Sequence, residues 1–95
     1  MIKSPLVLAE EQFTLSEEYS RYSGILADLI KEEAKFYNEN RPEKKSDTAV
    51  KRLWETTEKG VKKTIVELKL NSLSKTISSI KTLLEVLANE ARGLY

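Results

Sequence analysis

Residues 66–87, VELKLNSLSKTISSIKTLLEVL, decide the fold of this chain. Large apolar residues recur there at alternating intervals of four and three positions, and the rhythm continues to Ala91 and Leu94. This heptad spacing puts them on one side of an α-helix. The members of this apolar seam are Val66, Leu70, Leu73, Ile77, Ile80, Leu84 and Leu87. The seam predicts a long helix packed against another helix, either in the same chain or in a second copy.

Small hydroxyl residues fill many of the positions between the seam residues. Ser and Thr are poorer helix formers than Ala by several tenths of a kcal/mol, roughly. One interpretation is a packed face, since small side chains let a neighbouring helix approach closely; the other is a solvated face. We favour the packed face, because a two-stranded zipper would carry more charged residues beside its seam. The residues concerned are Ser72, Ser74, Thr76, Ser78 and Ser79.

Outward from the seam, capping signals and proline divide the rest of the chain. Ser4 followed by Pro5 is typical of a helix start, and apolar periodicity predicts a helix over about 5–37. Residues 38–46, NENRPEKKS, form a predicted loop. A second helix is expected over about 47–92, with Gly60 as the point where it can bend. We therefore predict one all-α domain, a long antiparallel helical hairpin of coiled-coil type over residues 1–95.

Apolar residues off the seam predict self-association. Two helices cannot cover large apolar side chains on several sides, and broad apolar patches are rare on soluble monomers. We therefore expect a homo-oligomeric helical bundle, a dimer or a tetramer. Aromatic residues at helical spacing, among them Phe13, Tyr19 and Trp54, are expected in the core. The off-seam residues are Leu6, Leu8, Phe13, Ile25, Ile30, Val61, Ile65, Leu68, Leu83 and Val86.

The composition argues against most chemistry. The chain has no His and no Cys, which removes the commonest general base and the commonest transition-metal ligands. We therefore expect no enzyme activity, no metal and no cofactor. No apolar run approaches the roughly 20 residues that span a bilayer, and the opening residues do not resemble a signal peptide. A cytoplasmic location without membrane contact is the expectation.

Charge is divided between the two halves of the chain. Residues 1–40 hold four Lys/Arg against eight Asp/Glu, and residues 41–95 hold twelve against seven. A lysine set on the second helix can contact nucleic-acid phosphates, or it can pair with the acidic first helix, which the hairpin brings alongside. We favour the pairing. The lysine set consists of Lys59, Lys62, Lys63, Lys69, Lys75 and Lys81.

The pattern SDTAVKRLWETTEKG…ELKLNSLSKTISSIKTLL, within residues 46–87, resembles small helical accessory proteins from recombination and replication modules of tailed bacteriophages. The resemblance rests on Ala49, Arg52 and Leu53, on the Thr57-Glu58-x-Gly60 turn, and on the closing heptad helix. It implies a phage-encoded helper that acts near DNA or on another protein, in the cytoplasm of a bacterial host. We expect a non-catalytic protein–protein interaction factor; the alternative is a nucleic-acid-binding oligomer that uses the lysine set.

Overall fold

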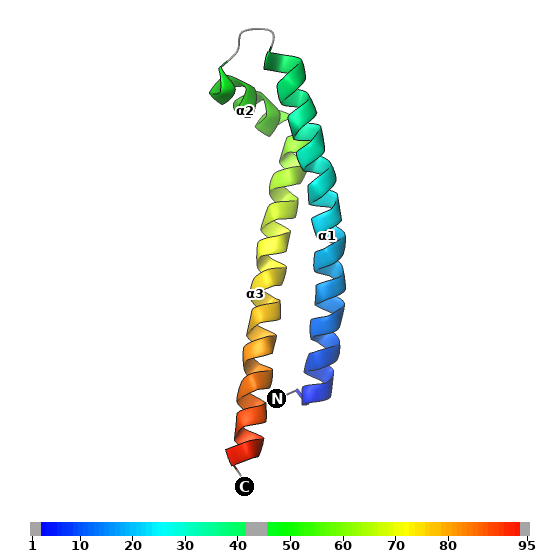
Figure 1. Cartoon of the computed structure of the whole chain (residues 1–95), viewed down its shortest axis with the longest axis vertical. Coiled ribbons are helices and arrows are strands. Elements are labelled where there is room, and N and C mark those ends of the chain that lie inside the picture. The colour runs from blue at the N-terminus through cyan, green and yellow to red at the C-terminus, as the bar shows by residue number, and fades with distance from the viewer. Residues whose placement is uncertain (1–2, 42–45, 94–95) are drawn as a thin grey trace.

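The computed structural model describes residues 3–41 and 46–93, which form three helices and no strand. α1 spans Pro5–Asn40, α2 spans Asp47–Thr56 and α3 spans Glu58–Gly93. α1 and α3 run side by side in opposite directions, and α2 lies across the end where they are connected (Figure 1). The molecule measures 70 × 19 × 19 Å. The predicted all-α class is confirmed, and the extended shape agrees with a helical hairpin.

Both α1 and α2 begin at a serine cap: the sequence indicates Ser4 for the first, and for the second it leaves Ser46 and Asp47 as alternatives. The backbone N–H of Val7 donates to the Ser4 hydroxyl at 3.3 Å, and Pro5 lies in the first turn of α1. The backbone N–H of Ala49 donates to the Ser46 hydroxyl at 3.2 Å at the start of α2. Each cap satisfies one of the N–H groups that a helix start leaves without a partner.

The first helix is longer than its predicted range of 5–37. It continues through Asn40, so the beginning of the predicted loop is helical. Arg41, directly before Pro42, also keeps a helical backbone, with φ −61° and ψ −38°, and its N–H donates to the Tyr37 carbonyl oxygen. The usual preference of the residue before a proline for an extended backbone therefore does not end the helix early. Residues 42–45 of the predicted loop lie outside the described residues, as does Leu94 at the end of the heptad pattern.

The segment predicted as one helix over 47–92 is two helices, divided at Thr57. The backbone of Thr57 is extended, with φ −74° and ψ 156°, and this ends α2. The Thr57 hydroxyl donates to the Trp54 carbonyl oxygen at 2.6 Å and accepts the N–H of Gly60 at 3.0 Å. One side chain thus closes α2 and caps α3. The break lies at Thr57, and Gly60, where a bend was expected, is helical.

Gly60 is required by a close approach between α2 and α3. A Cβ atom at this position would lie 1.8 Å from the Trp54 carbonyl oxygen, far inside any real contact. Only a residue without a side chain allows α3 to start this close to the end of α2. By contrast, a Cβ at Gly24 in α1 would meet nothing within 4 Å.

The core is narrow. Leu29, Val66 and Leu70 form a buried cluster between α1 and α3. At the connected end, α2 contributes Val50 and Trp54, of which 1% and 4% of the surface is exposed. The prediction that the aromatic residues lie in the core is wrong for Phe13 and Tyr19, which are 68% and 38% exposed, because a hairpin offers each helix a single long partner. The buried apolar residues are Leu8, Leu29, Val50, Trp54, Val66, Leu70, Leu73 and Ile80.

Candidate interaction surfaces

The apolar seam lies against α1 of the same chain. The spacing left two partners open, and in the structure Val66 and Leu70 pack on Leu29 of α1. Burial decreases toward the end of α3, where Ala91 is exposed. An oligomer must therefore use a surface other than the buried centre of the seam. Along the seam, Val66, Leu70, Leu73 and Ile80 are buried, and Ile77, Leu84 and Leu87 are half-buried.

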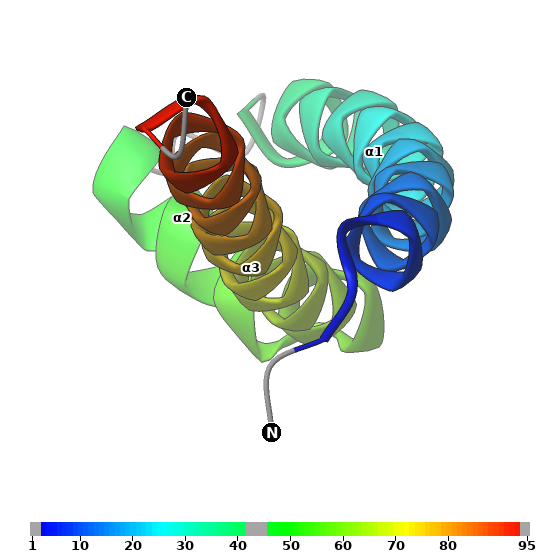
Figure 2. The same cartoon turned by 90° about the horizontal axis from the view of Figure 1, so that it is seen from below.

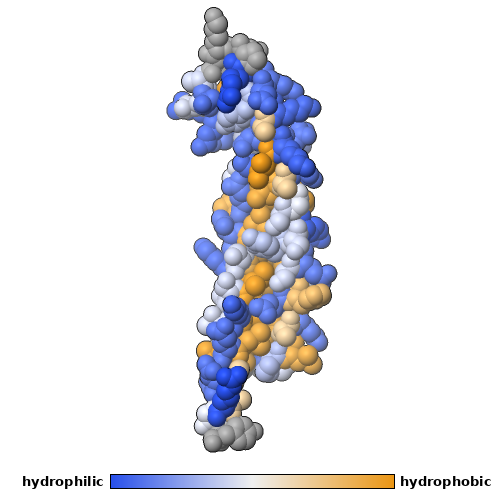
Figure 3. Space-filling model, viewed as in Figure 1, coloured by the Kyte–Doolittle hydropathy of each residue, from blue (hydrophilic) through white to orange (hydrophobic). Residues whose placement is uncertain are grey.

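Two open grooves follow the edges of the seam. One of them, of about 480 Å³, includes Thr14 and Thr76, with Ile80 in its wall. The other, of about 330 Å³, includes Ser78, with Ile77 in its wall. Thr76 and Ser78 are two positions apart, which places the grooves on opposite sides of the hairpin at ~3.6 residues per turn. Figure 3 shows a long apolar stripe still visible between the two helices.

A second apolar surface lies on α3, to one side of the seam. Its five large residues are each between 40% and 64% exposed. With ~3.6 residues per turn, they fall on one side of the helix together with three hydroxyl residues from its middle. We call this surface the outer stripe. It consists of Val61, Ile65, Leu68, Ser72, Thr76, Ser79, Leu83 and Val86.

The five hydroxyl residues that the sequence predicts on a packed face are not covered within the single chain. We call them the hydroxyl face: Ser72, Ser74, Thr76, Ser78 and Ser79. All five of its residues are exposed, and they divide between two sides, since Ser74 and Ser78 line the groove away from the outer stripe. The Thr76 hydroxyl donates to the Ser72 carbonyl at 3.1 Å, and the Ser79 hydroxyl donates to the Lys75 carbonyl at 2.9 Å. Covering this face by another chain stays a prediction.

The chain exposes more surface than its mass requires. Its accessible area is 7347 Å², whereas a compact monomer of 10.9 kDa exposes about 5,600 Å². Its radius of gyration is 20.1 Å, compared with about 12 Å for a compact domain of this length. The excess area exceeds the roughly 800 Å² that each partner covers in a standard protein interface.

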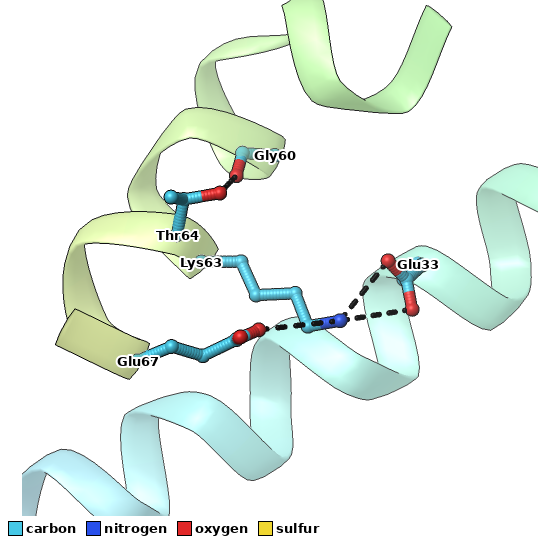
Figure 4. A network of polar contacts seen from close by, with 5 residues as sticks. All are labelled: Glu33, Gly60, Lys63, Thr64 and Glu67. Atoms are coloured by element: carbon cyan, nitrogen blue, oxygen red, sulfur yellow. Dashed lines mark hydrogen bonds and ion pairs between the residues drawn. The ribbon is translucent and has the colours of Figure 1, made fainter. Parts of the chain in front are cut away.

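Two members of the lysine set pair with the acidic first helix. Lys59 Nζ lies 2.8 Å from Glu32 Oε2. Lys63 Nζ lies 3.1 Å from both carboxylate oxygens of Glu33 and 3.5 Å from Glu67 of its own helix (Figure 4). These contacts join α3 to α1 near the connected end of the hairpin.

The remaining members of the lysine set do not form one strip. Lys69 Nζ lies 5.8 Å from the centre of the Tyr22 ring, a cation–π contact. Lys62, Lys75 and Lys81 are exposed and have no ion pair within the described residues. At about 100° per residue, these three point in different directions around α3. The structure therefore brings no continuous basic strip together on one side of the helix.

The ion pairs shift pKa values toward the charged forms. The hydrogen bond and the charge of Lys59 lower the pKa of Glu32. Burial alone would lower the pKa of Lys63, but hydrogen bonds and charges from Glu33 and Glu67 outweigh it and raise that pKa. Tyr37 differs from these pairs, because burial and then the neighbouring acids raise its pKa and so favour the neutral phenol. Stabilised charges are typical of structural pairs, whereas a general acid or base needs a pKa near the working pH.

Sequence reasoning identified Gly60 as a point where the helix can bend, but it did not predict that Thr57 divides the segment into two helices. The apolar pattern continues on both sides of Thr57, with Trp54 before it and Val61 after it, and this continuity favoured one helix. A signal was present, because Thr followed by Glu in the next position is typical of a helix start. The Phe36 and Trp54 rings, 5.5 Å apart, then hold α2 against α1.

Neither the described residues nor other proteins point to a known activity. In residues 3–41 and 46–93, no three or more acidic side chains gather where they could hold a metal ion. No helix in those ranges combines the length and apolar character needed to cross a membrane. No protein-family model matches the sequence, and neither the comparison with curated proteins nor that with solved structures finds a match. The function has to be argued from the surfaces.

Proposed function

We propose that this protein is a non-catalytic interaction factor that works as a homo-oligomeric helical bundle and docks on a protein partner. The observation that carries the proposal is the apolar surface left open along both long helices. Leu6 and Phe13 of α1 and Ile65 and Leu68 of α3 are each at least 60% exposed. Large contiguous apolar patches on soluble chains mark interaction sites. The excess of accessible area is enough for a standard interface.

The resemblance of residues 46–87 to phage accessory proteins adds a setting to this proposal. It implies a phage-encoded helper or host-modulating factor in the cytoplasm of a bacterium. No His or Cys is available for common catalytic chemistry, and the resolved pKa shifts of Glu32 and Lys63 belong to ion pairs. Binding is therefore the activity that the chain is best equipped to perform.

The test is the absolute mass in solution, measured by light scattering over a hundredfold range of concentration at low and high salt. We expect a mass of two or four chains that changes little with salt, because apolar contacts are not screened by ions. A mass that stays at 10.9 kDa throughout would contradict the oligomeric form of the proposal.

Nucleic-acid binding is the alternative, and the exposed Lys62, Lys75 and Lys81 are the observation in its favour. Their different directions around α3 and the pairing of Lys59 and Lys63 with α1 make it the weaker candidate. Anisotropy of a labelled DNA oligonucleotide, titrated at several salt concentrations, separates the two. Phosphate contacts require an affinity that falls steeply with salt; no binding at low salt would exclude the alternative.

A further inference from the structure

We infer that the outer stripe is the contact between two copies of this chain, arranged antiparallel about a two-fold axis that passes near Ser74. This inference rests on the proposed oligomer and names its interface and its orientation. The occupant of the surface is thus a second copy of α3. The seam continues to pack on α1 within each copy.

The order of residues along the outer stripe reads nearly the same in both directions. Val61 and Val86 lie at almost equal distances from Ser74, and so do Ile65 and Leu83. Nearer the middle, Leu68 corresponds to Ser79 and Ser72 to Thr76. A two-fold interface uses the same patch on both copies, so residue i meets residue j and j meets i. An antiparallel pair centred near Ser74 therefore brings large residues opposite large ones at both ends of the stripe and small ones opposite small ones in its middle, and only Leu68 faces a smaller residue, Ser79.

The middle of the outer stripe suits a close helix crossing. Ser72, Thr76 and Ser79 are small, and small residues let two helix backbones approach closely. Hydroxyl donors normally cost free energy when they lose water. Here Thr76 and Ser79 already donate to backbone carbonyls of α3, so burial leaves neither donor unsatisfied. The large residues then pack against each other on both sides of the crossing.

Charge does not oppose this contact. Lys59 and Lys63 of the same segment are paired with Glu32 and Glu33 of α1, so they do not face a second copy across the outer stripe. The antiparallel arrangement also places opposite ends of the two helix dipoles side by side, which favours that orientation.

Distances between spin labels test the orientation. The chain has no Cys, so Lys75→Cys and Lys62→Cys each give one label per copy, on exposed positions beside the outer stripe. With a rise of ~1.5 Å per residue, labels at position 75 should be under about 20 Å apart and labels at position 62 about 35 Å apart. Labelled samples are compared by light scattering with the unlabelled protein to verify that the assembly persists.

A matched pair of variants tests the face. Ile65 in the outer stripe and Ile30 in α1 are 60% and 49% exposed. Ile30 lies on the same side of α1 as Tyr19, which lines the groove of Ser78 on the side of the hairpin away from the outer stripe. Ile65→Lys should weaken self-association at least tenfold with helicity unchanged. Ile30→Lys should leave it unaltered. Equal weakening by both, or by neither, overturns the inference.

The distances separate failure of the inference from failure of the proposed function. Short distances at both positions would mean a parallel pair, and a long distance at position 75 in an oligomer would mean a different face. Either result overturns the inference and leaves the oligomer intact. A monomer at every concentration overturns both. An oligomer with the short and the long distance as expected supports both.

Discussion

At the connected end of the hairpin α2 lies across α1 and α3, whereas only α1 and α3 are present at the end that carries the termini (Figure 1). Viewed along the hairpin, α2 crosses behind α3 (Figure 2). Val50 and Trp54 of this third helix are buried, while Phe13 and Val86 at the other end stay exposed. The difference teaches that each of two paired helices buries only one of its faces. A third helix is needed to bury large side chains on all sides.

Trp54→Ala is the change with the largest expected effect, because it removes a buried side chain of α2 whose ring packs on Phe36 of α1. Loss of a buried Trp costs about 3–5 kcal/mol of unfolding free energy, measurable by urea denaturation followed by circular dichroism. The control is Leu53→Ala, at the neighbouring and 38% exposed position, with an expected loss below about 1 kcal/mol. Equal losses would mean that α2 does not enclose the connected end.

Gly60→Ala sharpens the comparison at the corner of α2 and α3. The new Cβ overlaps the Trp54 carbonyl oxygen, so the backbone must shift, at an expected cost of about 1–3 kcal/mol. Gly24→Ala is the matched control in α1, where the Cβ meets nothing, and it should stabilise by about 0.5–1 kcal/mol. In thermal unfolding, the melting temperature should fall for Gly60→Ala and rise for Gly24→Ala, each relative to the wild type. The same sign for both would refute the close approach.

Amide hydrogen exchange compares the two ends directly. Local opening is easier where few apolar contacts are buried. At concentrations where the chain is monomeric, amides of residues 61–70 should exchange roughly tenfold more slowly than those of 84–92. Mass spectrometry of peptides from the two segments measures the ratio. Uniform protection along α3 would remove the distinction between the enclosed and the open end.

Acid titration probes the smallest effect, the Lys59–Glu32 ion pair. The pKa of Glu32 is lowered from its usual 4.5, so the folded state favours its charged form. The contribution of the ion pair to the free energy of unfolding is complete above the unfolded-state pKa of Glu32. It disappears as the pH falls through the lower folded-state pKa. The melting temperature of Glu32→Gln should therefore lie below wild type at pH 6 and converge with it in acid. The control is Glu17→Gln, at a carboxylate without an ion pair in the described residues, and its melting temperature at pH 6 should stay close to that of the wild type.

Much of the fold follows from local patterns in the sequence. The seam repeats often enough to specify a helix, Ser4 caps the first helix as predicted, and Ser46 is the one of the two alternatives, Ser46 and Asp47, that caps α2. The break at Thr57 could not be deduced in the same way, because one capping residue competes with an apolar pattern that continues past it. The direction of α2 depends on Trp54 and Gly60 meeting in space, which is a tertiary contact.

The candidate surface was only partly predictable. Spacing identified the seam and the off-seam apolar residues Ile65 and Leu68. It did not show which other residues lie beside Ile65 and Leu68 on the exposed side of α3. Which side of α3 faces α1 decides whether a residue belongs to the core or to the outer stripe, and that becomes known only when the hairpin is built. The lysine set illustrates the same limit, since Lys59 and Lys63 reach α1 while Lys75 and Lys81 do not.

The tilted contact between Phe36 and Trp54 also has a consequence for how fast the chain folds. This contact joins α1 to α2 across a short separation in sequence. Closing a short loop costs less chain entropy than closing a long one, so this contact can form before the distant parts of α1 and α3 pair. We therefore expect folding to begin at the connected end and the two long helices to pair from there toward the termini. Substitutions at Trp54 should mainly slow folding, whereas those at Leu87 should mainly accelerate unfolding.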